Sequence, residues 1–512
     1  MTDDQPEPLR GVALAITAVA LALGTFMQVL DLTIANVSLP TIAGNLGVSP
    51  DTSTWIITSF AVANGISVPL TGWLMGRYGV VRIFMISVLT FTVASFLCGM
   101  AWSLSSLVFF RVIQGAGSGP MVPGSQALLL SIFPQEKRGT GLGIWSLTTL
   151  FGPIAGPLLG GYISDNYHWS WIFLINVPVG IFVTVVVWRM LRAQETPTRK
   201  LPIDRIGLIL LIVWAGSLQM MLDQGKDADW FHDPMIVVMA VLAGVGFAAW
   251  LIWELTDAHP IVDLSLTKNR NFLLGTIGLC LGFGIYFGNI VLLPLWLQTQ
   301  LGYTATWAGL AVAPSGITAV ILTPLITRLM AKIDIRWVAS MSFIALAVSY
   351  FMRAGYTTEV SFNTVMLGSI VQGIGAGAFF LSLLTILLND IPTDQLPAAG
   401  GLSNFARIIC SAFSASIVTT LWDRREAFHQ SRLVESATAN APAYVETIRQ
   451  LGRLGITGTR ADGVIDRLIS SQSYLMSTTD LYWVFGILTG GMLLLIWATH
   501  RARGGHAAAA ME

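Results

Sequence analysis

The chain has 512 residues, of which 54% are hydrophobic and only 11% are charged, whereas about 25% of the residues of an ordinary soluble domain are charged. Such a chain cannot cover its surface with polar groups, so the composition excludes a soluble protein and predicts an integral membrane protein. The 28 basic and 28 acidic residues balance. Net charge therefore does not indicate a nucleic-acid partner, and none is expected.

Fourteen apolar segments are long enough to span a bilayer as α-helices, which takes about 20 residues each. No stretch alternates between apolar and polar residues as a barrel strand does, so the predicted fold class is all-α. In chain order the predicted spans are roughly 11–31, 53–74, 80–101, 104–130, 139–163, 170–190, 204–223, 234–254, 271–297, 306–330, 336–353, 362–388, 397–421 and 479–499.

Positive charges fall on alternate connections between these spans. If the N-terminus lies inside, 17 Lys and Arg residues lie on the cytoplasmic side, whereas the short loops on the other side hold only Lys226 and Arg353. Because cytoplasmic loops carry an excess of Lys and Arg, this pattern predicts fourteen spans with both termini in the cytoplasm. The first ten residues hold three acids and one base, which is the wrong polarity for a signal peptide. The first span is therefore predicted to be a retained helix.

One connection, at about 422–478, is much longer than the others. It carries seven arginines on the predicted outer side, but long loops are largely exempt from the charge rule. Its segments "YVETIRQLGRLG" and "DGVIDRLISS" have the apolar spacing of helices. The sequence predicts a small, partly helical extracytoplasmic element, which is either a solvated connector or a docking site for a partner.

The fourth and twelfth predicted spans share a sequence pattern. "RVIQGAGSGP" begins at Arg111 and "SIVQGIGAGA" begins at Ser369. In addition, the second span begins with "STW" and the tenth with "ATW". The aligned residues of the longer match are Gln114, Gly115, Gly117 and Gly119 with Gln372, Gly373, Gly375 and Gly377.

This match predicts two homologous six-helix halves with two extra helices between them. Many secondary transporters are built from such repeats, with a central site whose access alternates between the two sides of the membrane. The predicted domains are an N-terminal bundle at 1–200, the inserted helix pair at 201–256, and a C-terminal bundle at 257–512 that includes the long loop.

Two charged residues stand out inside the predicted spans, Asp31 in "LDLTIANVSLP" and Arg111. Ionisable groups inside a membrane are rare and face a cavity or the interior of a bundle. Because desolvation favours the neutral form of a carboxylate, Asp31 is a candidate to take up and release a proton. The alternative is an interfacial aspartate that caps the outer end of the first helix.

Arg111 cannot neutralise itself, so it must be paired or hydrated. Asp31 is the expected partner, either directly or through water. A structural ion pair with no part in a transport cycle is the alternative for Arg111.

Several long strings resemble the fourteen-helix drug:proton antiporters of the EmrB/QacA type, which form part of the major facilitator superfamily. They are "FMQVLDLTIANVSLPTIAGNLG", "GGYISDNYHWSWIFLINVPVG", "IWELTDAHPIVDLSL" and "GYTATWAGL". The resemblance covers nearly the whole chain. It implies the major facilitator fold with fourteen transmembrane helices, and it implies roles in proton transfer for Asp31 and Arg111.

The string "GPIAGPLLGG" in the fifth span resembles the antiporter motif of this superfamily. Small residues at four-residue spacing let helices approach closely, and proline removes a backbone hydrogen bond and bends a helix. The resemblance implies a pliable, tight contact between the two halves that favours export over uptake. The matching residues are Gly152, Gly156, Pro157, Gly160 and Gly161.

The string "GWLMGRYGVVR" resembles the cytoplasmic gate motif of the superfamily through Gly72, Arg77, Gly79 and Arg82. It departs from that motif at Gly76, where aspartate is usual, so an acidic latch to a neighbouring helix is expected to be missing. The alternative is that the two arginines only anchor the topology.

Further polar and aromatic residues within the spans are candidates to line a substrate cavity, although each alone is more often a packing or interhelix residue. Asp223 ends the seventh span and is expected to be exposed at the membrane interface. The cavity candidates are Met27, Gln28, Asn36, Asn64, Gln114, Trp145, Phe287, Asn289, Gln372, Asn404 and Arg407.

Together these features predict a proton-coupled exporter of hydrophobic drugs in a bacterial inner membrane, of the kind that confers antibiotic resistance. The resemblance implies a tripartite efflux pump with a periplasmic membrane-fusion adaptor of the EmrA type and an outer-membrane channel of the TolC type. A proton-coupled uptake or metabolite transporter on the same fold is the alternative.

An enzyme is not expected, because no nucleophile–base pair lies at membrane depth. No metal site is expected, because no HExxH or paired-histidine spacing occurs. No cofactor is expected either: the sequence has no GxxxxGK[ST] nucleotide-binding motif, and the proton-motive force is the predicted energy source.

Overall fold

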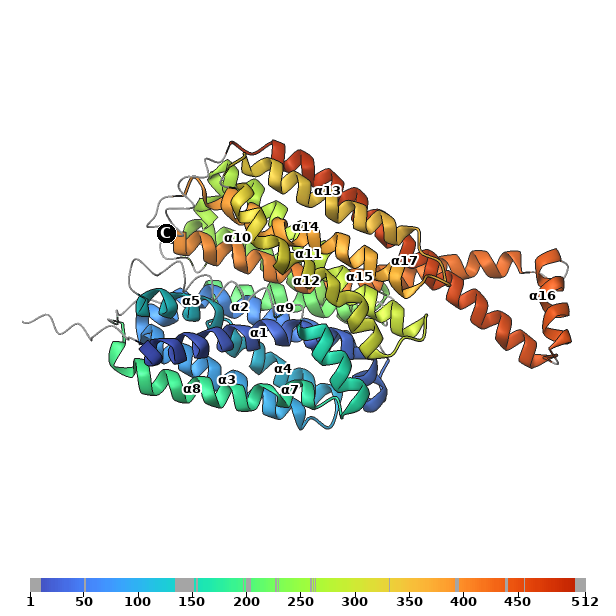
Figure 1. Cartoon of the computed structure of the whole chain (residues 1–512), viewed down its shortest axis with the longest axis horizontal. Coiled ribbons are helices and arrows are strands. Elements are labelled where there is room, and N and C mark those ends of the chain that lie inside the picture. The colour runs from blue at the N-terminus through green and yellow to red at the C-terminus, as the bar shows by residue number, and fades with distance from the viewer. Residues whose placement is uncertain are drawn as a thin grey trace, which may run out of the picture.

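The computed structural model describes residues 11–49, 52–133, 152, 155–196, 198, 204–225, 228, 230–257, 260, 262, 264–330, 332–391, 396–437, 441–454 and 456–501. All regular secondary structure in these residues is helical, which agrees with the expected fold class. Most helices run along the long axis of the molecule (Figure 1). Helices suit a membrane protein because a backbone in lipid must satisfy its own hydrogen bonds.

The helices fall into three groups along the chain. The N-terminal half holds α1 (Gly11–Leu46), η1 (Thr52–Thr54), α2 (Trp55–Tyr78), α3 (Val80–Gly99), α4 (Leu104–Ser118), α5 (Met121–Ile132), a helical segment at 155–166, α7 (Trp171–Leu174), α8 (Asn176–Leu191) and η3 (Arg192–Gln194). The inserted pair is α9 (Arg205–Gln224) and α10 (Pro234–Thr256), with η4 (Trp230–His232) between them and η5 (Leu264–Lys268) after them. The C-terminal half holds α11 (Arg270–Thr299), α12 (Ala305–Met330), α13 (Ile335–Ala354), α14 (Phe362–Leu388), α15 (Leu396–Ser436), α16 (Pro442–Arg453) and α17 (Thr459–Trp497).

Eleven helices in the described residues are long and apolar enough to cross a membrane, and α2 makes twelve if its two parts, bent by 55° around position 69, form one span. These twelve match predicted spans. The predicted span at 104–130 is two helices instead, α4 and α5, which meet at Gly119 and Pro120. The predicted span at 139–163 lies mostly outside the described residues. The total of fourteen therefore stays a prediction.

The repeated glycines make equivalent contacts in the two halves. A Cβ at Gly115 of α4 would lie 2.4 Å from the Phe60 carbonyl oxygen of α2, and a Cβ at Gly373 of α14 would lie 2.2 Å from the Ser315 carbonyl oxygen of α12. Two residues further on, Gly117 faces α3 and Gly375 faces α13. The missing side chains let α4 and α14 approach two neighbours each, so the sequence repeat is also a structural repeat.

The predicted long loop is almost entirely helical. α15 continues unbroken past Trp422 to Ser436, and α17 begins at Thr459. With α16 they form a projection that extends beyond the bundles, orange to red at the right of Figure 1. We call the residues between Trp422 and Ser477 the arm, and the end of the bundles from which they project the arm end. The prediction of a small, partly helical element was too modest, because two spans extend into the arm without a break.

Hydrogen bonds close the base of the arm. Trp422 donates through Nε1 to Thr478 Oγ1 at 2.8 Å, and Ser477 Oγ donates to the Trp422 carbonyl oxygen at 2.5 Å. Beyond them, Asp480 accepts from Arg425 and, at 2.7 Å, contacts His429 Nε2. The two long helices therefore leave the bundle as a joined pair.

The two halves meet along the part of the molecule near the arm end. Gln298 of α11 donates to the Val37 carbonyl oxygen of α1 at 3.0 Å. Asp165 accepts from the backbone N–H groups of Ala305 and Thr306 at 3.2 and 2.7 Å. A carboxylate at the N-terminus of a helix is favoured by the helix dipole, so one half caps a helix of the other.

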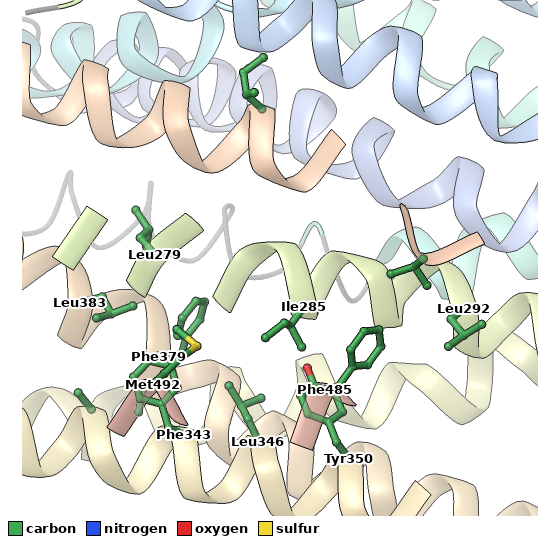
Figure 2. Packing of buried hydrophobic residues seen from close by; sticks show 14 of the residues in the cluster. Leu279, Ile285, Leu292, Phe343, Leu346, Tyr350, Phe379, Leu383, Phe485 and Met492 are labelled. Carbon is green, nitrogen blue, oxygen red and sulfur yellow. The ribbon is translucent and has the colours of Figure 1, made fainter. Parts of the chain in front are cut away.

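The C-terminal half has a continuous apolar core between α11, α13, α14 and α17. Figure 2 shows Phe343, Phe379 and Met492 close together, with Leu346, Tyr350 and Phe485 further along the same core. Phe343 and Phe379 pack edge to face with ring centroids 5.8 Å apart. Such pairs add to the stabilisation that comes from burial alone.

Replacing Gly373 with alanine should destabilise the fold, because its Cβ would fall 2.2 Å from a carbonyl oxygen of α12. We expect a loss of about 1–3 kcal/mol, the usual cost of overpacking, measured as the free energy of unfolding in detergent micelles. Gly216→Ala in α9 is the control, since nothing lies within 4 Å of its Cβ. Equal stability of the two variants would contradict the proposed close contact.

Candidate functional site

Asp31 and Arg111 form a buried ion pair inside the N-terminal half. Arg111 of α4 donates through Nη1 to Asp31 Oδ2 of α1, and the two side chains are 1% and 0% exposed. The same guanidinium donates through Nε to the Ile56 carbonyl oxygen of α2 at 2.8 Å and lies over the ring of Phe60, 4.1 Å from its centroid. The charge of the arginine is thus met by a carboxylate, a carbonyl oxygen and an aromatic face.

Neutral side chains form the remaining hydrogen bonds of this ion pair. Gln114 accepts from Arg111 Nη1 at 2.8 Å and donates to Asp31 Oδ1 at 3.0 Å. Asn176, the first residue of α8, donates to the same Oδ1 at 3.2 Å. Ser95 of α3 accepts from both amides, at 2.6 and 3.3 Å. A buried ion pair is tolerated when its remaining hydrogen-bonding positions are filled in this way.

The position of Asp31 decides between the two interpretations of the sequence. α1 continues to Leu46, so Asp31 lies within the helix and does not cap its end. Its side chain is surrounded by groups from α3, α4 and α8 and does not face lipid or bulk water. The sequence analysis singled out Asp31, Arg111 and Gln114 as candidates but not Ser95 or Asn176. These two residues approach the ion pair only when α3 and α8 pack beside α1.

The C-terminal half contains a second buried polar network at the repeated positions. Arg353 donates to Asn289 Oδ1 at 2.9 Å and to Gln372 Oε1 at 2.8 Å. Ser369 Oγ lies 3.4 Å from Nη2, and the exposure of Arg353 is 0%. The sequence placed Arg353 in a short outer loop, which is wrong. It lies in the last turn of α13, buried inside the bundle, where Asn289 and Gln372 supply the acceptors that its guanidinium group needs.

The two networks are related by the repeat but differ in charge. Gln114 and Gln372 occupy equivalent positions in the two halves. Asn289 contacts Gln372 in the C-terminal half as Asp31 contacts Gln114 in the N-terminal half. Ser369 takes the place of Arg111 on the fourth helix of its half, so the arginine of the C-terminal half comes from the third helix. Only the N-terminal network contains a carboxylate among the residues that the structure describes.

The glycines of the antiporter motif face two partners. A Cβ at Gly156 would lie 2.1 Å from Thr33 Oγ1, and Cβ atoms at Gly152 and Gly160 would lie 2.6 and 2.5 Å from the nearest atoms of α1. Gly161 instead approaches the Ala305 carbonyl oxygen of α12, in the other half. Pro157 also contacts α12, because its carbonyl oxygen would lie 2.3 Å from a Cβ at Gly309. The motif therefore joins α1 to its own half as well as joining the halves.

A carboxylate does contact the gate motif, although its usual aspartate is absent. Glu195, which follows η3, accepts from the backbone N–H groups of Val81 and Arg82 at 3.0 and 2.8 Å. Gly79 has a φ of 94°, which favours glycine, and its Cβ would lie 2.3 Å from Glu195. Glu195 caps α3 from within the N-terminal half; the absence of a latch from position 76 to a neighbouring helix stays a prediction.

Other residues of the gate motif show different surroundings. Arg77 stacks over the rings of Trp73 and Tyr78, 5.5 and 5.7 Å from their centroids. Gly72 has open space where a Cβ would stand. Arg82 is exposed and contributes its backbone to the Glu195 contact.

The remaining cavity candidates are dispersed. Met27 packs in the core of the N-terminal half, and Phe287 lies in an apolar cluster to which both halves contribute. Gln28 and Asn36 of α1 are buried with no hydrogen-bond partner for their amide oxygens. Trp145 lies outside the described residues.

Three more candidates form hydrogen bonds, and one of them lies over an aromatic ring. Asn64 of α2 donates to Ser118 of α4 at 2.5 Å. Arg407 donates to Asn404 at 3.1 Å and lies over the ring of Phe283, 4.6 Å from its centroid. Asp223, expected at the exposed membrane interface, is only 5% exposed, because α9 packs against α2 and α15.

Two repeated helical bundles, each with a buried polar network, form an architecture that many secondary transporters use. The sequence matches the family model of the Major Facilitator Superfamily over residues 21–415. The multidrug export protein EmrB of Escherichia coli strain K12 is 48% identical over 495 residues, 96% of each chain. The fatty acid resistance protein FarB of Neisseria gonorrhoeae is 44% identical, over 98% of this chain and 99% of that protein.

Solved structures agree at the level of the fold. A bacterial homologue of the human lysosomal transporter Spinster, in an inward-facing and unoccupied conformation, superposes with a TM-score of 0.63 at 16% identity, covering 96% of this chain and 98% of that one. The match to the family model and the identity to EmrB show that the chain belongs to the Major Facilitator Superfamily. This membership confirms the expectation of a multi-pass membrane transporter.

Removal of the Glu195 side chain should destabilise the start of α3, because two backbone N–H groups would lose their acceptor. For Glu195→Ala we expect a loss of about 0.5–2 kcal/mol, the range for a helix cap, measured as the free energy of unfolding. Glu359→Ala, in an exposed connection, serves as the control. If both variants unfold alike, Glu195 does not cap α3.

Proposed function

We propose that the chain is a proton-coupled antiporter that exports hydrophobic drugs. Multidrug export is supported by the 48% identity to EmrB over nearly the full length. The observation that carries the proton coupling is the Asp31–Arg111 pair, which is the one intramembrane carboxylate–guanidinium contact among the described residues. Carboxylates at membrane depth are typical of proton pathways in transporters.

The network supports a simple exchange at Asp31. When Asp31 accepts a proton, its attraction to Arg111 weakens, and the guanidinium keeps its acceptors Ile56 and Gln114. The neutral carboxyl group can still bond to Gln114 and Asn176. Protonation would therefore loosen the contact between α1 and α4 without leaving a polar group bare, and substrate binding would compete with this state as the halves rock.

The orientation that we propose has fourteen spans and both termini in the cytoplasm of a bacterial inner membrane. It is supported by the position of the first described residue of α1 and of the end of α17, which lie at the same end of the molecule, opposite the arm (Figure 1). Near that end Arg336 of α13 donates to the Thr499 carbonyl oxygen at 3.2 Å. Basic residues at this end agree with a cytoplasmic face.

The arm end would then face the periplasm. There we propose contact with a membrane-fusion adaptor of the EmrA type and, through it, with an outer-membrane channel of the TolC type. The proposal is supported by the length of the helices that project from the membrane body. Apolar side chains exposed on the arm include Val434, Leu454 and Leu468, and they would offer apolar surface to such a contact.

An Asp31→Asn variant should fold but lose uphill drug transport. The C-terminal half already holds a buried arginine on Asn289 and Gln372, so an asparagine at position 31 is tolerable, yet it cannot carry a proton. The measurement is drug transport in proteoliposomes under an imposed pH gradient. Asp462→Asn, an exposed position on the arm, is the control. Unchanged uphill transport by Asp31→Asn would reject Asp31 as the coupling site.

The arm can be tested separately from transport. Replacement of residues 432–470 by a short flexible linker should leave transport in proteoliposomes intact, because the ion pair lies deep in the bundle. The same variant should lose drug resistance in cells, where export needs the adaptor. Full resistance in cells at equal expression would mean that the arm is only a connector.

A further inference from the structure

A buried polar cluster joins the inserted helix α9 to both halves of the protein. It contains Asp223 and Gln219 of α9, Thr58 of α2 and Ser416 of α15. Their exposed fractions are 5%, 2%, 0% and 1%. None of these four residues takes part in the Asp31 or Arg353 networks.

The cluster is a continuous chain of hydrogen bonds. Thr58 Oγ1 donates to Asp223 Oδ2 at 3.0 Å, and Gln219 Nε2 donates to the same oxygen at 2.8 Å. Gln219 Nε2 also donates to Ser416 Oγ at 2.6 Å. The path therefore runs from α2, in the N-terminal half, through α9 to α15, in the C-terminal half.

Apolar packing continues the same contact away from the arm end. Ala61, Val62 and Ala412 form a small buried cluster between α2 and α15. Next along these antiparallel helices, a Cβ at Gly65 would lie 2.8 Å from Ile409 Cδ1. The four polar residues thus lie at the arm-end side of a seam whose next described contacts, toward the other end, are between apolar side chains.

The inserted pair is also fixed to the C-terminal half by aromatic packing. Trp214 of α9 lies 6.2 Å from Phe413 of α15, and Trp250 of α10 lies 6.3 Å from Phe405, measured between ring centroids. These contacts fix α9 to α15. The Thr58–Asp223 hydrogen bond is therefore the step of the hydrogen-bonded path that crosses to the N-terminal half.

We propose that Asp223, held by Gln219, is a positioning residue of the transport cycle that latches the arm end of the two halves closed. Opening this end requires α2 to move away from α15, which breaks the Thr58–Asp223 bond or the Gln219–Ser416 bond. Hydrogen bonds to a carboxylate are stronger than those between neutral groups, and the four side chains that make them here are at most 5% exposed. The inserted helices therefore shift the balance between the closed and open states, together with the other contacts between the halves at this end, such as that of Asp165 with Ala305 and Thr306.

This inference rests on alternating access, as the proposed function does, but its test measures shape rather than transport. Spin labels at Ser105 and Glu359, exposed positions at the arm end of the two halves, report the distance between the halves. The labels are placed in a transport-competent background without the three native cysteines. The readout is the ratio of the long-distance to the short-distance population.

Gln219→Leu and Asp223→Leu should each raise this ratio about tenfold, as expected when a bond to a charged group is lost. Asp223→Asn keeps only a neutral acceptor for Thr58, so its ratio should lie between those of the parent and Asp223→Leu. Ser217→Ala, a buried hydroxyl elsewhere on α9, is the matched control. If the leucine variants fail to fold, Ser416→Ala removes one bond at the edge of the cluster and should shift the ratio in the same direction.

Two results would overturn the proposal: an unchanged ratio in the folded cluster variants, or an equal rise in Ser217→Ala. If the cluster is a latch, the leucine variants should also have a higher apparent KM than the parent for drug offered from the side opposite the arm. Fewer molecules of these variants would be open on that side. A parent protein that shows the distance change but pumps no drug under a pH gradient would contradict the proposed function and leave the latch standing.

Discussion

A guanidinium group cannot lose its charge inside a membrane, so the bundle must bring acceptors to it. This constraint explains the arrangement of both halves. Arg111 is met by Asp31, Gln114 and the Ile56 carbonyl oxygen, and Arg353 is met by Asn289 and Gln372. Each set of acceptors comes from several helices, so the helices must pack closely around the arginine. The glycines of α4 and α14 make that close packing possible.

The comparison of the two networks indicates how the halves have divided their roles. They keep a glutamine at the same place, but only the N-terminal network has a carboxylate among the described residues. Asn289 binds the arginine without offering a site for a proton. In the proposed cycle the N-terminal network would change its charge at Asp31, whereas the described residues of the C-terminal network offer no carboxylate for a proton. This asymmetry agrees with a single coupling site at Asp31.

The inserted helices are more than a connection between the halves. α9 packs on both α2 and α15, and its polar end reaches the seam where the halves meet. The arm extends the last two spans on the same side of the molecule. The contacts between the halves, the polar cluster of α9 and the base of the arm thus gather at one end of the protein, which is the end where opening would release substrate.

The sequence alone determined the membrane class, the helical fold, the repeat and the buried pair. Composition and span length reflect the solvent in which the chain lives, and a charge in an apolar run must be paired, so Asp31 and Arg111 could be matched without coordinates. The hydrogen-bond partners Ser95 and Asn176 could not be predicted. A serine or asparagine within a span gives no indication of which residues of other helices it will contact.

Only the tertiary structure decided the places of Arg353, Asp223 and Glu195. A charged residue near the end of a span has the same local sequence whether it faces water or a packed neighbour. Packing of α13 against α14, and of α9 against α2 and α15, buries the first two, and the approach of Glu195 to the start of α3 supplies an acid that the motif lacks. Long-range contacts of this kind leave no mark on hydropathy or spacing, which record only what a residue's near neighbours in the chain require.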